Sequence, residues 1–317
     1  MLGRTNIGGS GGLVTLNGSP ITYAANIEFD DETVNNISME ALPYTFYKGC
    51  AVVYNNELHI LGGGDSGTNS GTKHYKWNGS SWISVSTLPY RFSGGCSVVY
   101  NNEIHILGGG YSKTRHYKWD GSSWTSVSTL PYEFYSNGAV VVYHDSIHIL
   151  GGGYESGKYH FHYKWDGSSW TSVSTLPYEF HSGSALVYND EIHILGGAIS
   201  NSDKFHYKWD GSSWTSVSEL PYTFYGGSSV VYNNELHIIG SSFSTPLTTM
   251  NHYKFDGSKW TSVSTLPYDF YNSSVVVFIN QIHMLGGSDS GNGTGTETGK
   301  NHYIVTSSSY DKLYLPI

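Results

Sequence analysis

Histidine is the residue whose number and spacing most strongly suggest chemistry, because 15 copies occur and twelve of them recur at equivalent places. Neutral imidazole is a common ligand of zinc and other transition metals, so repeated histidines could form a metal site if the fold brought them together. Whether they meet depends on the elements that carry them. The two series are His59, His105, His148, His193, His237 and His283, and His74, His116, His162, His206, His252 and His302.

Motifs of several common enzyme classes are missing from the sequence. There is no Gly-x-Ser-x-Gly elbow of a serine hydrolase and no His-Glu-x-x-His helix of a metalloprotease. The glycine runs that begin at residues 62, 108 and 151 each end a predicted strand and open no helix, so they do not form a phosphate-binding loop. We therefore expect that the protein is not an enzyme.

One turn resembles part of an enzyme motif. The run from Asp120 to Trp124 resembles the aspartate box of sialidases, but it is one residue too short. Sialidases also hold the carboxylate of their substrate with three arginines. This chain has three arginines in all, Arg4, Arg91 and Arg115, and Arg4 lies in a Gly-rich segment before the repeats. We therefore expect no sialidase site.

The histidines and the turns belong to a repeat that occurs six times. Its Leu-Pro-Tyr marker begins at residues 42, 88, 130, 176, 220 and 266, which gives spacings of 46, 42, 46, 44 and 46 residues. Each period contains four short strand patterns, here called a to d. In the first period they are residues 51–54, 58–61, 74–77 and a strand that begins at Trp82. A fixed period of this length indicates a repeat architecture.

A Gly-Gly pair ends strand b and a Trp opens strand d in this repeat, as at Gly62, Gly63 and Trp82. In these features the sequence resembles the kelch repeat family, and the likeness covers residues 42 to about 305. The resemblance implies an all-β fold, a six-bladed kelch-type β-propeller with four antiparallel strands in each blade.

The two ends of the repeat region complement one another. Residues 37–41 stand directly before the first Leu-Pro-Tyr, where strand d stands in other repeats, whereas residues 302–305 match strand c and no Trp follows them. We expect the N-terminal segment to supply the fourth strand of the last blade and so close the ring. A seventh blade built from residues 13–41 would lack both the Gly-Gly pair and the Trp. The predicted division is a Gly-rich lead or attachment segment, 1–26, and a propeller, 27–317.

A six-fold ring decides against a metal site. Equivalent residues in a ring stand far apart unless they line its axis. His59 shares with Leu61 a sheet face that packs against the next blade. We therefore expect hydrogen-bonded structural histidines and no bound metal. Kelch-type galactose oxidase uses copper with a Tyr–Cys cross-link. Here Cys50 and Cys96 hold one scaffold position in consecutive repeats, so we expect no cofactor and no disulfide between them.

Variation between the repeats indicates where binding would occur. The b–c connection and the d–a connection, Leu-Pro-Tyr-x-Phe-z, vary, and both leave an antiparallel blade on the same face, whereas the a–b and c–d turns are nearly constant. Aromatic rings there suit sugar stacking or contact with protein loops. Alternatively, the z side chains only plug the central channel. The candidate ligand-binding residues are Tyr47, Arg91, Tyr111, Lys113, Arg115, Glu133, Tyr135, Tyr154, Glu179, His181, Tyr225, Asp269 and Tyr271.

Composition restricts the partners and the location. The formal net charge is −9, only 13% of residues are charged, and no basic run occurs, which argues against nucleic acid and against anionic membrane surfaces. No apolar stretch approaches the length of a membrane span, and the N-terminus has no signal-peptide core. We expect a location in a virion tail, or outside the cell without a signal peptide. A cytoplasmic location would fit an interaction scaffold.

The near-identical repeats, the Gly-rich lead and the Tyr, Ser and Asn bias are similar to kelch-like tail-fibre and adhesin proteins of phages that infect Gram-positive bacteria. That resemblance implies a receptor-binding protein for a cell-surface glycan or protein, joined through its N-terminal segment to a virion partner or to further copies. The alternatives are a kelch protein-interaction scaffold and a polysaccharide-degrading enzyme. Only Glu133, Glu179 and Asp269 hint at the carboxylates that such an enzyme would need.

Overall fold

The computed structural model describes residues 14–16, 19–21, 34–64, 69–110, 113–134, 138–153, 158–197, 204–241, 250–268, 270–287 and 298–307. The chain divides into two compact units. One comprises residues 1–33 and 307–317 and contains an antiparallel pair, β1 (Val14–Leu16) and β2 (Ser19–Ile21). The other, Val34–Thr306, contains all the remaining strands. The predicted domain boundary between residues 26 and 27 stays a prediction.

Six four-stranded sheets form the blades of the larger unit. Blade 1 contains β4 (Cys50–Tyr54), β5 (Glu57–Leu61), β6 (Lys73–Trp77) and β7 (Trp82–Thr87). Blade 2 contains β8 (Cys96–Tyr100), β9 (Glu103–Leu107), β10 (Arg115–Trp119) and β11 (Trp124–Thr129). Blade 3 contains β12 (Ala139–Tyr143), β13 (Ser146–Leu150), β14 (Phe161–Trp165) and β15 (Trp170–Thr175).

The second half of the ring follows the same order. Blade 4 contains β16 (Ser184–Tyr188), β17 (Glu191–Leu195), β18 (His206–Trp209) and β19 (Trp214–Ser216). Blade 5 contains β20 (Ser228–Tyr232), β21 (Glu235–Ile239), β22 (His252–Phe255) and β23 (Trp260–Ser262). Blade 6 contains β24 (Ser274–Phe278), β25 (Gln281–Leu285), β26 (His302–Ser307) and then β3 (Val34–Ser38). The described helices are short 3-10 turns, η1 (Asn69–Thr72), η2 (Lys158–His160) and η3 (Thr298–Lys300).

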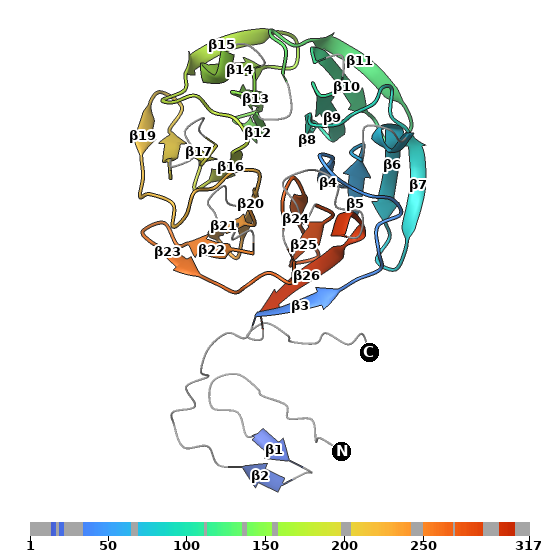
Figure 1. The fold of residues 1–317 in the computed structure, drawn as a ribbon, viewed down its shortest axis with the longest axis vertical. Helices are drawn as coiled ribbons and strands as arrows, with labels where there is room; N and C mark the ends of the chain where they lie inside the picture. The colour runs from blue at the N-terminus through green and yellow to red at the C-terminus, as the bar shows by residue number, and fades with distance from the viewer. Residues whose placement is uncertain are drawn as a thin grey trace. The chain divides into compact units, whose positions relative to one another are not determined.

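The blades surround a central axis, with the six a strands innermost (Figure 1). Strand β24 of the last blade packs beside β4 of the first, as every other a strand packs beside the next, so the ring is closed. Strand β3 is the outer strand of blade 6, and just beyond it the Met39 N–H donates to the His302 carbonyl oxygen at 2.8 Å. The predicted six-bladed all-β propeller, closed by an N-terminal strand, is confirmed.

Short turns set the two faces of the disc. The a–b turn of blade 1 holds Asn55 and Asn56 at φ 49° and 57°, the left-handed pair that a tight hairpin needs. On the other face, the Phe92 N–H of a d–a connection donates to the Gly71 carbonyl of a b–c connection at 2.7 Å. The face of the b–c and d–a connections is called the variable face, and the opposite one the constant face.

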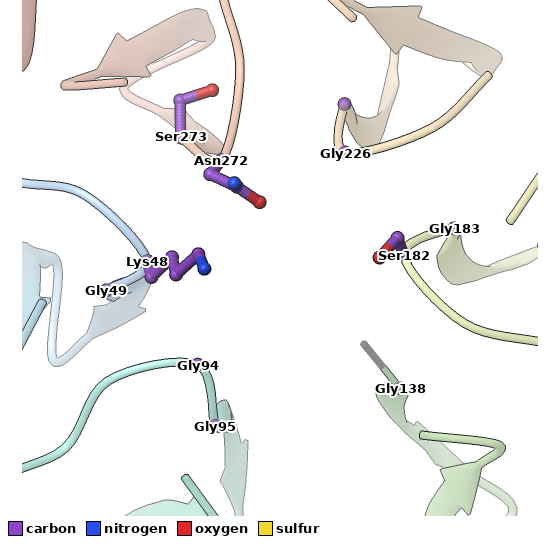
Figure 2. A pocket seen from close by; sticks show the side chains of 11 residues that line it. Lys48, Gly49, Gly94, Gly95, Gly138, Ser182, Gly183, Gly226, Asn272 and Ser273 are labelled. Atoms are coloured by element: carbon purple, nitrogen blue, oxygen red, sulfur yellow. The ribbon is translucent and has the colours of Figure 1, made fainter. Parts of the chain in front are cut away.

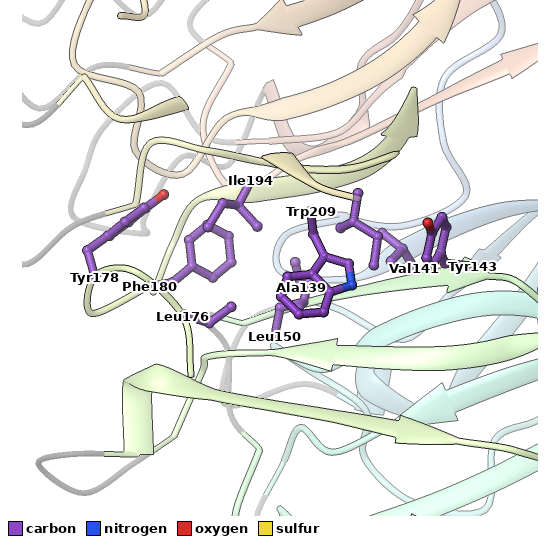
Figure 3. Close-up of a cluster of buried hydrophobic side chains, with 10 residues drawn as sticks. Ala139, Val141, Tyr143, Leu150, Leu176, Tyr178, Phe180, Ile194 and Trp209 are labelled. Carbon is purple, nitrogen blue, oxygen red and sulfur yellow. The ribbon is translucent and has the colours of Figure 1, made fainter. Parts of the chain in front are cut away.

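The hydrophobic core lies between neighbouring blades. Figure 3 shows one such cluster, in which Val141 and Leu150 of blade 3 meet Phe180, Ile194 and Trp209 of blade 4. The remaining interfaces are filled by equivalent clusters. Because each blade buries its apolar side chains against the next, the free energy of folding comes largely from the interfaces, and a single blade could not bury them alone.

The repeated histidines join neighbouring blades, as expected of structural residues. Nδ1 of His59 is hydrogen-bonded to Nε2 of His74 at 2.8 Å, and Nδ1 of His74 to Oγ of Ser86 at 2.9 Å. The same Ser86 oxygen accepts a 3.1 Å hydrogen bond from Nε1 of Trp124 in the next blade. Equivalent relays join blade 2 to blade 3 and blade 3 to blade 4.

The relay is incomplete where the ring closes. Glu40 occupies in blade 6 the position that Ser86 occupies in blade 1. Nε1 of Trp82 is buried with no hydrogen-bond partner among the described residues. Asn36 replaces the expected Trp, and Oγ of Ser264 in blade 5 likewise has no partner within the described chain. The interfaces on both sides of blade 6 therefore lack this relay hydrogen bond, and so does the interface of blades 4 and 5, where Nδ1 of His206 and Nε1 of Trp260 have no described partner.

The two cysteines are free thiols, as predicted. Sγ of Cys50 donates a hydrogen bond to the Gly95 carbonyl oxygen of the next blade at 3.0 Å, and Sγ of Cys96 donates to that of Gly138 at 3.3 Å. Burial raises the pKa of the Cys50 thiol to about 12, so it is protonated at neutral pH and a poor nucleophile.

Replacing Trp124 by Phe should destabilise the protein more than replacing Trp82 by Phe. Both tryptophans are half-buried and open the d strands of neighbouring blades, but only Trp124 donates its indole N–H to a described serine. Losing that hydrogen bond should lower the free energy of unfolding by about 1 kcal/mol beyond the common cost of the smaller ring. Urea denaturation of the two variants measures the difference, and equal losses would contradict the role assigned to the relay.

The protein should lose stability as the pH falls from about 6.5 to about 4. All twelve repeated histidines are buried, and burial lowers the pKa of His59 to about 4 and that of His74 to about 3. Below pH 6.5 the unfolded chain binds protons that the folded chain does not, so the free energy of unfolding must decrease with falling pH. Thermal melts between pH 7.5 and 4.5 test this, and a constant midpoint over that range would contradict it.

Candidate functional site

A ring of residues in the left-handed backbone conformation lines the central channel at the variable face. Each one follows position z of its d–a connection, and inter-blade hydrogen bonds join the backbone N–H of four of them to the carbonyl oxygen of the equivalent residue in a neighbouring blade. The four bonds run from Gly94 to Lys48 (2.7 Å), Lys48 to Asn272 (3.0 Å), Asn272 to Gly226 (2.9 Å) and Gly226 to Ser182 (2.6 Å). These five residues are called the left-handed ring, and their φ angles lie between 48° and 71°.

The ring surrounds a hollow of about 110 Å³, called the channel hollow. Figure 2 shows the side chains of Lys48, Ser182 and Asn272 directed into it from different blades. Glycines form most of the remaining lining, but Ser273 stands at one of the equivalent places, and its Oγ is buried without a hydrogen-bond partner among the described residues. The lining of the hollow is thus polar, and its residue types differ from blade to blade.

Aromatic rings at position z stand beside this ring in four consecutive blades, and the set of Tyr47, Tyr271, Tyr225 and His181 is called the aromatic arc. The rings of His181 and Tyr225 lie 5.6 Å apart, edge to face, and Nδ2 of Asn272 donates to the Tyr47 hydroxyl at 3.0 Å. Burial raises the pKa of Tyr271, and the nearby phenols of Tyr47 and Tyr225 raise it further, so the three tyrosines are close neighbours.

Glycine is required beneath the arc. Gly226 has φ 71°, and a Cβ atom there would lie 2.5 Å from the ring of Tyr271. A side chain at residue 226 would therefore displace the ring of Tyr271.

His181 is the member of the arc in blade 4. Its ring packs against Tyr159 at 5.3 Å as well as against Tyr225, and Nδ1 is buried with no hydrogen-bond partner in the described part of the chain. Burial lowers the pKa of His181, and the carboxylate of Glu179 opposes that shift only in part. The imidazole is therefore neutral at pH 7, and it offers a polar atom without adding charge.

Lys48 belongs to this site and was missed by sequence reasoning. Its Nζ lies 5.3 Å from the centre of the Tyr47 ring, and no described carboxylate lies within ion-pair distance of it. Burial lowers the pKa of Lys48. Ser182, Asn272 and Tyr159 were missed too. The residue after z varies among Lys, Gly, Ser and Asn, and that variation was the signal that could have found three of them.

Other predicted residues lie in separate contacts. Nζ of Lys113 forms a 3.4 Å ion pair with Glu133, and the Arg115 guanidinium lies 5.0 Å from the centre of the Tyr90 ring. The residue equivalent to Arg115 covers the marker tyrosine in three other blades as well, in the pairs Lys73–Tyr44, Phe161–Tyr132 and Phe205–Tyr178. Its position therefore has a packing role whatever residue occupies it.

The structure brings together four of the thirteen candidates, those of the aromatic arc, with Glu179 beside His181. Arg91 is half-buried on the d–a connection that leads into blade 2. Tyr111, Tyr135, Tyr154 and Asp269 lie outside the described residues. That any of the thirteen binds a ligand stays a prediction.

Two further features bear on the range of functions. Among the described residues, no three His, Cys, Asp or Glu side chains are grouped as metal ligands would be. The helices found there are too short and too polar for any of them to cross a membrane.

Comparison with known proteins shows the fold. No family model matches the chain, and no curated protein matches it. A solved structure titled "Structure of YjhT" is similar over 85% of this chain and 95% of its own, with a TM-score of 0.68 and 15% sequence identity. Identity at that level shows a shared propeller architecture alone, so membership of the kelch family stays a prediction.

Two substitutions test the left-handed ring. Gly226→Ala should destabilise the protein by about 1–3 kcal/mol, because alanine is strained at positive φ and its Cβ meets Tyr271. Asn272→Gly should change stability by less than about 1 kcal/mol, because glycine is at ease at φ 48° and already stands at the equivalent Gly94. Thermal unfolding measures both, and a harmless Gly226→Ala would contradict the described backbone.

Proposed function

We propose that the protein is a non-catalytic receptor-binding protein that holds a cell-surface glycan against the aromatic arc. The observation that carries this proposal is the arc itself, in which Tyr47, Tyr271, Tyr225 and His181 are neighbours and each directly precedes a residue that lines the channel hollow. They are the positions at which the repeats differ, on a scaffold that is otherwise nearly uniform.

The chemistry of the arc suits a sugar. The C–H face of a pyranose packs on flat tyrosine rings, while its hydroxyl groups need hydrogen-bonding partners close to those rings. The amide of Asn272 and the hydroxyl of Ser182 lie in the adjoining hollow. Because inter-blade backbone hydrogen bonds hold both residues, they are positioned before any ligand arrives, which reduces the entropy lost on binding.

A role in attachment also follows the resemblance to kelch-like phage tail fibres and adhesins. One arc on one disc offers a small contact area, so single-site affinity would be low. Display of several copies, through the N-terminal segment or a virion partner, would raise the overall avidity by orders of magnitude. The location proposed with this role is a virion tail or the cell exterior.

Binding without cleavage is proposed because the two described acidic candidates, Glu133 and Glu179, have separate contacts in different blades. The carboxylate of Glu133 is held by Lys113 at 3.4 Å, and Glu179 stands beside neutral His181 in another blade. Hydrolysis of a glycosidic bond needs two carboxyl groups about 5–10 Å apart across the scissile bond.

A protein-interaction scaffold is the second candidate. The propeller fold is compatible with it, and tyrosines on rigid loops are also typical of protein interfaces. In that case the arc would contact a protein loop and show no preference among glycans.

Binding to a panel of bacterial cell-surface polysaccharides, followed by calorimetry with fragments of the one bound, tests the proposal. Tyr225→Ala and Tyr271→Ala should each weaken binding at least tenfold, since each removes a stacking surface of about 1–2 kcal/mol. His144→Asn is the matched control, because His144 is an exposed aromatic residue on the constant face and asparagine occupies its place in most blades. No new reducing ends should appear.

Three outcomes would overturn the proposal. Unchanged binding by both arc variants would show that another surface is used. Release of reducing ends that persists after repurification would show an enzyme. Binding to a protein receptor after its glycans are removed, with no polysaccharide bound, would favour the scaffold.

A further inference from the structure

We propose that the channel hollow receives one singly charged anionic group of the ligand, a phosphodiester or a carboxylate, with Lys48 as its counter-ion. This inference rests on the proposed function for the glycan that carries the group. The anion site itself can be tested independently with small molecules.

Lys48 is the only charged residue among the described residues that line the hollow. Its side chain extends into the hollow (Figure 2), and its one described side-chain contact is the ring of Tyr47. Three other lysines, Lys76, Lys118 and Lys208, each contact a glutamate on strand b at 2.9 to 3.0 Å, whereas Lys73 resembles Lys48 in lying over a tyrosine ring. A half-buried ammonium without a carboxylate is the feature that calls for an external anion.

The electrostatic surroundings agree. Burial lowers the pKa of Lys48, and no neighbouring charge is among the causes of that shift. An anion bound beside the ammonium would favour its charged form and reverse the shift. The protein as a whole has a net charge of −9, whereas the described lining of the hollow carries one positive charge, that of Lys48.

The backbone conformation of Lys48 indicates that lysine is present there for its side chain. Lys48 has φ 55°, a conformation that strains a long L residue, whereas Gly94 and Gly226 occupy the same place in other blades without strain. The inter-blade hydrogen bond of this position needs only main-chain atoms, so glycine would serve the ring equally well. Non-glycine residues at positive φ also stand at Ser182 and Asn272, and these three side chains are the ones directed into the hollow.

The rest of the hollow supplies donors for an anion. The amide of Asn272 donates to the Tyr47 hydroxyl and also hydrogen-bonds Tyr271, and the hydroxyl residues Ser182 and Ser273 belong to the same lining. Oγ of Ser273 is buried with no partner within the described residues. A volume of about 110 Å³ is several times the roughly 15 Å³ that one water needs, so a small charged group fits there while its sugar remains on the arc.

Calorimetry with three probes tests the inference: methyl glucuronide as the carboxylate, diglycerol phosphate as the phosphodiester, and methyl glucoside as the neutral reference. At least one charged probe should bind at least tenfold more tightly than methyl glucoside, and added salt should weaken it. The better charged probe identifies the source of the anion. Equal binding of all three probes would overturn the inference.

Variants of Lys48 separate charge from folding. Lys48→Gly should weaken the charged probe at least tenfold with an unchanged melting temperature, because Gly94 and Gly226 already hold this position. Lys48→Arg should restore most of the affinity. Lys164→Gln, which removes the same charge from an exposed residue of β14, should bind as the parent does. Parent-like anion binding by Lys48→Gly would contradict the assignment.

The two proposals fail in different ways. If no polysaccharide binds but the charged probe binds through Lys48, the proposed glycan role is wrong and the anion site stands. If a neutral polysaccharide binds through Tyr225 and Tyr271 and Lys48→Gly leaves that binding unchanged, the arc stands and the anion site is wrong.

Discussion

Packing between neighbouring blades is the interaction on which the whole structure depends, and it is complete only if the first and last blades meet. Two sets of contacts join them at different distances from the axis. Strand β3 adds to β26 at the outer edge, and the N–H of Lys48 donates to the carbonyl oxygen of Asn272 at the channel. The aromatic arc crosses this same junction, since Tyr47 belongs to blade 1 and Tyr271 to blade 6. Closure of the ring is therefore also assembly of the candidate site.

The six-fold repeat separates structural residues from candidates for function, but variation alone does not identify a site. The buried histidine pairs recur in all six blades and the Gly-Gly pair in five, as expected of residues that each blade needs in order to fold and pack. At the position of Arg115 the residue type changes between blades while its role, covering a marker tyrosine, does not. Position z and the residue after it differ from the position of Arg115. Their residue types vary between blades, and the residues after z line one shared channel hollow.

Much of the fold could be predicted from the sequence, because the Leu-Pro-Tyr period, the two-residue turns and the unmatched ends all follow local rules that six copies repeat. The arc was predicted in part, since Tyr47, His181, Tyr225 and Tyr271 were chosen as loop residues on one face. Lys48, Ser182 and Asn272 were not, because their direction depends on a left-handed backbone conformation that residue types other than glycine seldom adopt. The ion pair of Lys113 with Glu133 was not predicted either, because it is a contact between two connections that spacing does not reveal.

Amide chemical-shift mapping during titration with the bound polysaccharide fragment tests the location of the site most directly. The largest shifts should fall on the backbone N–H groups of Lys48, Gly226 and Asn272, whose inter-blade hydrogen bonds border the channel hollow, and on His181 at the end of the arc. Shifts concentrated instead on the constant face, at turns such as Asn55–Asn56, would contradict the placement of the binding site at the channel mouth.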